Sequence, residues 1–254
     1  TCKIRIPDGL YDTYCETKYG WELYSRRLDD GVVREFTYDH LIYMPLTDST
    51  VQVVGAEPNY VGAIHIPDSV AYGEKKYAVV HIMQRAFYNN NSITGISFEH
   101  GLQTIGEYAF YGCSGLSGIL ELPSSITAIP QYAFCDCIGL SGVVIPPTVT
   151  TIGHSAFRRC TGLSGELVIP DGVTSIGAYA FSGCNNFTGE VKIPAALTTI
   201  DDYTFYGTEK IEHFVFAPNN KLRVIGSYAF ANSGIKDTLI IPEMVTEIKS
   251  YAFY

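Results

Sequence analysis

Apolar residues recur in one fixed order along most of the chain. The clearest marker is a phenylalanine that follows a small residue, and successive markers lie 23 to 25 positions apart. They are Phe87, Phe110, Phe134, Phe157, Phe181, Phe205, Phe230 and Phe253. An internal repeat of this length is typical of solenoids, in which each copy forms one coil and buries its apolar face against its neighbours. We therefore predict about eight stacked coils.

The order of signals within one copy predicts a strand followed by a compact turn. In LSGVVIPPTVTTIGHSAFRRC, the apolar run at residues 143–145 favours a strand, and Pro146 ends it because proline has no N–H to donate to a sheet. Apolar residues then recur at wider steps, as at Val173, Ile176 and Phe181 in the next copy. Such steps favour a loop and then a short helical or 3₁₀ turn on the outer side. Parallel stacking of the strands gives an α/β solenoid with a continuous parallel sheet.

Glycine often follows the repeated isoleucine of a copy, as at Gly106 and Gly153. Pro130 occupies the same place in another copy, and proline holds φ near about −65°. We therefore expect these glycines to provide room and not a left-handed backbone.

Both ends of the chain depart from the repeat. LIYMPL and VQVV flank TDST, and YGEKKY lies between two apolar runs, so each stretch predicts a β-hairpin. Upstream, KIRIP resembles a repeat strand without its AF partner. Because the apolar end of a solenoid must be covered, residues 1–62 are expected to form a β-rich N-terminal cap on a solenoid of residues 63–254. The last copy ends at Tyr254 without a capping sequence, so we expect that the natural protein, or its ordered part, was cut there.

The repeat L-x-x-I-x-I-P-x-x-V-T-x-I-G-x-x-A-F-x-x-C resembles the BspA-type leucine-rich repeat family over about residues 39–254. The resemblance implies a right-handed leucine-rich repeat solenoid with a concave parallel sheet. It also implies a secreted or cell-surface protein, mostly of host-associated bacteria, and some members of the family are adhesins. Departures from the pattern are local: Glu99 and Ala217 replace the proline, Thr204 replaces the alanine, and APNNKL lengthens one loop.

The charge of the chain changes the choice of partners. Lys and Arg number 17 against 26 Asp and Glu, and the resulting net charge of −9 repels phosphate backbones and anionic lipids. Nucleic acid is therefore not an expected partner. Membrane insertion is not expected either, because no run of about eighteen apolar residues exists. The chain starts at Thr1 without a leader, which indicates a mature or trimmed fragment.

Four cysteines share one repeat position, three residues after the marker phenylalanine. They are Cys113, Cys137, Cys160 and Cys184. Asn90, Thr208 and Ser233 fill this position in other copies, so a buried ladder of small hydrogen-bonding side chains explains it. Disulfides between neighbouring coils are not expected, because a spacing of about 4.8 Å is too long for bridged Cβ atoms.

The other cysteines give weak signals. Cys135 and Cys137 form a C-x-C pair, but a metal site needs a second pair or a nearby histidine. Cys2 and Cys15 lie outside the repeat, where a disulfide between them remains open, as does a lipid anchor on Cys2. We predict no metal and no cofactor.

No set of reactive groups predicts an enzyme. The six histidines show no metal-ligand spacing, and the serines of the LSG turns do not lie in a G-x-S-x-G motif. Six tyrosines precede their marker phenylalanine by two positions: Tyr108, Tyr132, Tyr179, Tyr203, Tyr228 and Tyr251. They fit either a carbohydrate-stacking platform or an outer packing ladder, and the ladder is the simpler explanation for one residue per coil.

Strand alternation turns one row of residues outward on the predicted concave sheet. The predicted ligand-binding surface comprises Ile119, Glu121, Val144, Glu166, Val168, Glu190, Lys192, His213, Val215 and Ile240. A solvated sheet face ordinarily carries polar residues, so this mixture of apolar and acidic side chains suits a protein contact with an acidic rim. The alternative is that valine and isoleucine are present for strand propensity alone.

Together these observations predict a secreted or surface-anchored module that binds a protein or glycan ligand, such as a component of a host matrix or surface, without catalysis. The alternative is a structural spacer that holds another domain away from the cell. An enzyme ranks third.

Overall fold

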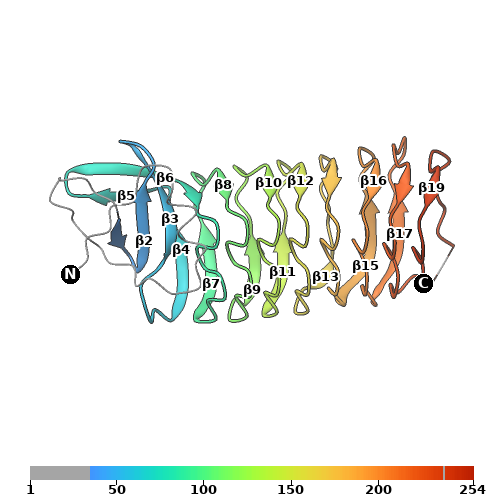
Figure 1. Ribbon diagram of the computed structural model, residues 1–254, viewed down its shortest axis with the longest axis horizontal. Coiled ribbons are helices and arrows are strands. Elements are labelled where there is room, and N and C mark those ends of the chain that lie inside the picture. The colour runs from blue at the N-terminus through green and yellow to red at the C-terminus, as the bar shows by residue number, and fades with distance from the viewer. Residues whose placement is uncertain (1–34, 237) are drawn as a thin grey trace, which may run out of the picture.

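The computed structural model describes residues 35–236 and 238–254, which form a stack of coils behind an N-terminal cap (Figure 1). Each coil contributes up to two strands. The longer strands are β4 (Gly62–Ile66), β7 (Ile93–Phe98), β9 (Gly118–Glu121), β11 (Leu140–Val144), β13 (Ser164–Glu166), β15 (Asn186–Ile193) and β17 (Ile211–Phe216). The short strands are β8 (Thr104–Ile105), β10 (Ala128–Ile129), β12 (Thr151–Ile152), β14 (Ser175–Ile176), β16 (Thr199–Ile200), β18 (Val224–Ile225) and β19 (Glu247–Ile248).

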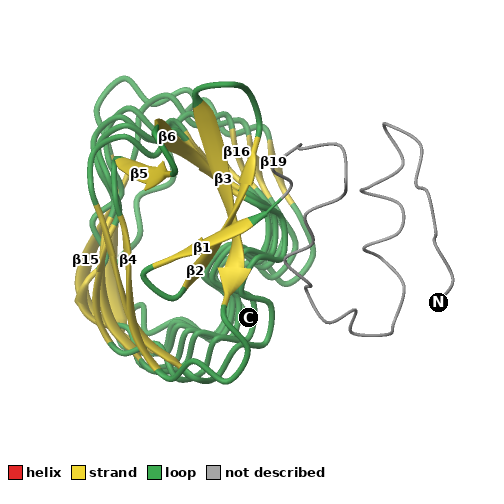
Figure 2. Ribbon diagram, turned by 90° about the vertical axis from the view of Figure 1, so that its left-hand side faces the viewer, coloured by secondary structure: helices red, strands yellow, loops and turns green. Residues whose placement is uncertain are grey.

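Strands of one kind pair in parallel from coil to coil, as predicted. The longer strands form the sheets β4-β7, β9-β11 and β13-β15-β17, and the short strands form β10-β12-β14 and β16-β18-β19. Figure 2 looks along the stack and shows β4 and β15 on one side of the coil, with β16 and β19 on another. The molecule is therefore a β-solenoid with a closed core between its two kinds of strand.

The marker phenylalanines form the central column of the core. Consecutive rings stack with centroids 5.0–5.8 Å apart and interplanar angles of 1–14° from Phe87 to Phe253. The first seven of these rings are fully buried. Parallel stacking of near-identical coils places the same side chain above itself, so each ring adds dispersion and stacking energy to two neighbours.

The outer turn of each coil is not a helix. The described residues contain no helix, so the predicted short helical or 3₁₀ turns are wrong, and the α/β class with them. In the second coil, the N–H groups of Ala109 and Tyr111 donate to carbonyls three residues earlier, whereas those of Tyr108 and Phe110 donate to carbonyls of the next coil. A helix would use every N–H within its own segment. Because every second N–H here holds the neighbouring coil, the segment forms successive turns.

A residue other than glycine carries the left-handed backbone of each outer turn, and it is tyrosine in six of the eight coils. Tyr108 has φ 58°, and the equivalent residue has φ between 52° and 60° in all eight coils. This conformation is costly for a residue with a Cβ, and the bonds on both sides of it hold it in place. Gly106 is not left-handed, but a Cβ on it would lie 2.3 Å from the backbone nitrogen of Gln84. The predicted need for room at this position is therefore confirmed.

A β-sheet at the N-terminal end of the described residues continues into the solenoid, and we call this sheet, which extends beyond residue 62, the cap. It contains β1 (Phe36–Tyr38), β2 (Leu41–Pro45), β3 (Thr50–Ala56), β5 (Ser69–Tyr72) and β6 (Lys75–Ile82), in the order β1-β2-β3-β6-β5. Both predicted hairpins are confirmed, because β2 pairs antiparallel with β3, and β5 with β6. β3 pairs in parallel with β6, and β6 in parallel with β8, so the cap covers the first coil by extending its ladder.

Part of the predicted cap lies outside the described residues, including the KIRIP segment and the candidate pair Cys2 and Cys15. The division of the chain at residue 62 stays a prediction.

We expect Phe157→Ala to destabilise the protein by about 3–5 kcal/mol, because a buried ring in the middle of the column leaves a cavity between two stacked neighbours. Chemical denaturation measures the loss. Val168→Ala is the matched control, since Val168 is exposed, and it should change the free energy of unfolding by less than about 0.5 kcal/mol. A loss below about 1 kcal/mol for Phe157→Ala would show that the column does not stabilise the stack.

Candidate functional site

The longer strands and the equivalent segment of the last coil turn one row of side chains outward, and we call this row the strand face. All ten residues predicted for the ligand-binding surface are exposed on it. The residues that alternate with them, Leu120, Leu167, Val191 and Phe214, are buried. The predicted alternation is thereby confirmed, although Val168 follows the end of β13 and Ile240 lies in no assigned strand. The role of these residues in ligand binding stays a prediction.

Parallel register brings several predicted residues side by side. Glu121 pairs with Val144, Glu190 pairs with His213, and Lys192 pairs with Val215. Both of these strand pairs contain a register shift, at Leu140/Gly142 and at Gly189/Glu190. The strand face therefore places apolar, acidic and basic side chains beside one another in neighbouring coils, instead of separating them into two patches.

The carboxylates of the strand face are available for a partner. Glu121, Glu166 and Glu190 are exposed and make no ion pair within the described residues. Lys192 differs, because its Nζ lies 2.8 Å from Oδ1 of Asp171. The one predicted cation of the surface is thus partly neutralised, which leaves the face acidic.

A histidine, a serine and a glutamate meet at the N-terminal end of the strand face, and the sequence reasoning missed this contact. His65 Nδ1 lies 2.9 Å from Ser97 Oγ, and its Nε2 lies 3.4 Å from Glu99 Oε1. Glu99 Oε2 accepts the backbone N–H of Asp68 at 2.6 Å, and this bond is the main cause of the lowered pKa of Glu99. Glu99 stands where other copies have proline, so its carboxylate ties two coils together. The signal was the glutamate at the proline position of its copy.

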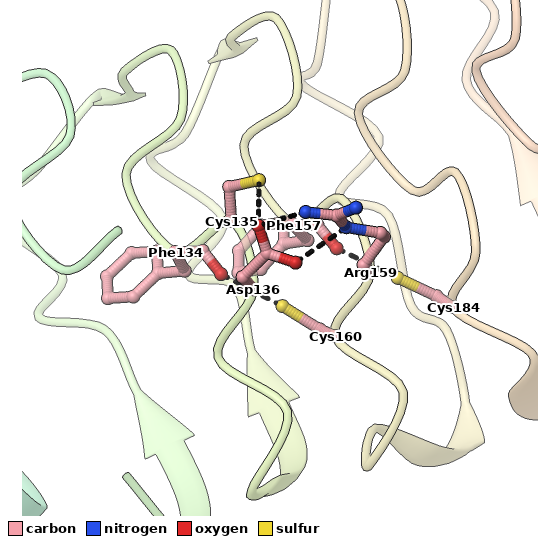
Figure 3. Close-up of polar contacts among 7 residues, drawn as sticks. All are labelled: Phe134, Cys135, Asp136, Phe157, Arg159, Cys160 and Cys184. Atoms are coloured by element: carbon pink, nitrogen blue, oxygen red, sulfur yellow. Dashed lines mark hydrogen bonds and ion pairs between the residues drawn. The ribbon is translucent and has the colours of Figure 1, made fainter. Parts of the chain in front are cut away.

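The cysteine ladder is confirmed as a packing element. Cys113, Cys137, Cys160 and Cys184 are completely buried and free. Each Sγ donates to the carbonyl of the marker phenylalanine one coil earlier, as Cys160 does to Phe134 at 3.0 Å (Figure 3). Burial raises the pKa of Cys113 and of Cys184 to about 12. These thiols stay protonated near neutral pH, and a protonated thiol is a poor nucleophile and metal ligand.

Cys135 lies beside an ion pair and not beside a second ligand. Asp136 accepts two hydrogen bonds of 2.6 Å from Arg159 of the next coil (Figure 3). Burial alone would raise the pKa of Asp136, but these bonds and the charge of Arg159 outweigh it and lower the pKa. Burial also raises the pKa of Cys135 to about 12. Within the described residues, no group of three His, Cys, Asp or Glu side chains is placed to hold a metal ion.

The outer tyrosines form a packing ladder, as the simpler explanation predicted. Tyr108 stacks on Tyr132, and Tyr179 on Tyr203, with centroids 4.6 Å apart in both pairs. The fourth coil has Ser155 instead of tyrosine, and His154 fills the gap at 5.1 Å from Tyr132 and 5.6 Å from Tyr179. Because the ring faces cover one another, they are not open for a sugar to stack on.

The sequence reasoning also missed a groove at the C-terminal end of the strand face. The groove has a volume of 510 Å³ and lies between β17 and the last coil. Residues 214–217, 219 and 220 form one wall, and Thr238, Ile240, Pro242, Glu243 and Met244 form the other. The predicted residues Val215 and Ile240 thus face each other across an opening. The lengthened loop APNNKL was the signal, because Asn219 and Asn220 of this loop line the groove.

Comparison with known proteins agrees with the repeat and with the fold. A family model described as a BspA type leucine rich repeat region matches residues 80–165 and 163–254 in six copies. A leucine-rich repeat protein from Bacteroides ovatus ATCC 8483 is 30% identical with a TM-score of 0.66, and the match covers 84% of this chain but only 60% of that protein. The T. pallidum leucine rich repeat protein is 25% identical with a TM-score of 0.65, covering 78% of this chain and 88% of that protein.

No curated protein matches the chain. The part of the chain that the structure describes has no helix long and apolar enough to cross a membrane.

We expect the four ladder cysteines to resist alkylation in the native protein at pH 8 and to react fully after unfolding without reductant. Their burial and raised pKa keep the thiolate population low, and free thiols need no reduction. Mass spectrometry of the labelled peptides identifies each site. A disulfide mapped between two adjacent ladder cysteines would contradict this expectation.

The same pKa shifts predict a loss of stability in alkali. Unfolded cysteine ionises near pH 8.5, whereas the folded thiols keep their protons to about pH 12, so the free energy of unfolding falls as pH rises through this window. Cys184→Ser keeps a donor for the Phe157 carbonyl but removes one ionisable group. Urea denaturation at pH 7 and pH 10 should show a smaller fall for Cys184→Ser than for the native sequence, by about 2 kcal/mol. Equal falls would show that Cys184 ionises in the folded state.

Proposed function

Because the chain belongs to the BspA-type leucine-rich repeat family, we propose that it is a binding module of a secreted or cell-surface protein, which holds a protein ligand on its strand face and performs no catalysis. Bacterial leucine-rich repeat proteins are generally protein-interaction or surface modules. The chain spans 60% of the length of the Bacteroides ovatus protein. Any activity that would need a whole protein of that length is therefore proposed here and not observed.

One observation carries the proposal: large apolar side chains recur on the exposed strand face. Ile119, Val144, Val168, Val215 and Ile240 are 42–79% exposed, one in each of five coils. A row of this kind exposes apolar area to water at a free-energy cost that a bound partner would remove. The free carboxylates of Glu121, Glu166 and Glu190 lie along the same row, where they would favour a partner with basic groups at its rim.

A protein ligand is favoured over a glycan. Sugar sites present open aromatic faces and dense polar groups, whereas the outward residues of the strand face in coils three to eight are mostly valine, isoleucine and glutamate. The aromatic ladder lies on the outer turns, and its rings cover one another. A glycan bound through the strand face would have few partners there.

Attachment to a cell surface also belongs to this proposal. The family resemblance favours a secreted or surface protein, and a lipid on Cys2 is one way to anchor it. Cys2 lies outside the described residues.

A spacer is the second candidate. The phenylalanines stack continuously from Phe87 to Phe253, so the same packing stabilises the solenoid along its length, as a rigid spacer requires. A spacer needs no particular strand face, so the two functions differ in what substitutions on that face do.

We expect the double substitution Val144→Asp and Val168→Asp to weaken binding to a protein ligand by at least about tenfold, or about 1.4 kcal/mol. A screen of matrix proteins and glycans against the purified domain supplies the ligand, and surface plasmon resonance measures the affinity. Both valines are exposed, so circular dichroism and the melting temperature should stay unchanged. Affinity within about twofold of the native value would show that the central strand face is not the binding site. If the protein is a spacer, the screen should yield no ligand.

A further inference from the structure

The groove lies between β17 and the last coil. It is open because backbone hydrogen bonds join the coil of β17 to the last coil on only some sides. On the other side of the coil, β18 pairs with β19, and in the outer turn Phe230 N–H donates to the Ala252 carbonyl. On the strand face, β17 pairs only with β15 among the described residues. The last coil is therefore held at its back, at its outer turn and at Glu212 near the start of β17, and it leaves the rest of β17 as an open edge.

The open edge presents main-chain groups of known direction. Ala217 N–H donates to the Ile193 carbonyl of β15, and Lys236 N–H reaches the Glu212 carbonyl from the other side. Backbone groups alternate along a strand, so the N–H and C=O of Phe214 and Phe216 point away from β15 and toward the groove. Unpaired groups of this kind are a template for another strand.

A buried amide supplies a second, independent sign of a ligand. Asn220 is 8% exposed and lines the groove. Its Oδ1 accepts the Leu222 N–H at 2.7 Å, which fixes which end of the amide is the donor. Its Nδ2 has no hydrogen-bond partner among the described residues. A buried donor without a partner carries a free-energy penalty that an acceptor on a ligand would relieve.

We propose that this groove binds an extended polypeptide segment of a partner protein, which adds a strand to the edge of β17 and gives a carbonyl to Asn220 Nδ2. Apolar side chains of the segment would pack between Val215 on one wall and Ile240 and Met244 on the other. Strand addition explains the open edge, the apolar walls and the lone amide together, since main-chain bonds supply affinity and side-chain pockets supply specificity. The inference rests on the proposed binding function and narrows its location and ligand.

Charge selects the occupant. Glu243 lines the groove, is exposed, and makes no ion pair within the described residues. The chain as a whole carries a net charge of −9. A second copy of this chain would bring a like charge to an acidic groove, whereas a segment with alternating apolar residues and a lysine or arginine at its flank is complementary.

The test selects ligands from a phage-displayed library of random linear peptides panned on the purified protein. We expect enriched peptides to alternate apolar residues and to carry a basic flank. The double variant Ile240→Ser and Met244→Ser should weaken their binding by at least about tenfold, because it removes the apolar wall without adding charge. The matched control, Leu46→Ser and Ile138→Ser, alters two exposed apolar residues outside both the groove and the strand face and should leave peptide affinity within about twofold.

Two spectroscopic readouts report on strand addition itself. Peptide binding should slow hydrogen exchange at the amides of Phe214 and Phe216 and shift the side-chain NH₂ resonances of Asn220. No peptide enriched over the protein-free control, affinity retained by the groove variant, or unchanged exchange at both amides would each overturn the inference. A different result would contradict the proposed function itself: a protein ligand that keeps its affinity for both the strand-face variant and the groove variant.

Discussion

Hydrogen bonds from each coil to the next are the constraint on which the rest of the structure depends. In the outer turn they use every second N–H, and this sharing prevents a helix and puts a left-handed backbone at residues such as Tyr108. A single coil would leave these donors, and the apolar faces of its strands, without partners. The coils therefore stabilise one another, and no coil is a folding unit by itself.

In-register stacking turns each repeat position into a ladder with one physical role. Phenylalanine fills the core, cysteine donates to the previous coil's phenylalanine carbonyl, and tyrosine stacks along the outer turn. A substitution in one copy is tolerated where a neighbour supplies the same contact. Ser155 interrupts the tyrosines, but His154 occupies the space between Tyr132 and Tyr179. The chemistry of these side chains is used for packing, whereas the outward side chains of the strand face make few contacts within the stack and are exposed.

The strand face and the groove differ in how they arise. The face follows from regular pairing, so each coil adds its own outward residues to a surface of mainly apolar and acidic side chains. The groove follows from a failure of that pairing, where the last coil leaves Phe214 and Phe216 at an open edge. In the proposed binding module, the face would supply contact area, whereas the groove would supply affinity through main-chain bonds and specificity through its side-chain pockets.

The sequence alone determined the repeat, its register, the parallel pairing, both hairpins of the cap and the outward row on the strands, because strand alternation and the spacing of Phe and Pro are local properties. It also identified Cys160 and its equivalents as packing residues. Helical outer turns were a wrong expectation, since the spacing of Val173, Ile176 and Phe181 fits a helix as well as a series of turns. Only tertiary structure decides between them, because the choice depends on whether an N–H bonds within its own coil or to the next. The contact of His65 with Glu99 and the groove beside Asn220 were likewise decided between coils, where spacing along one copy carries no information.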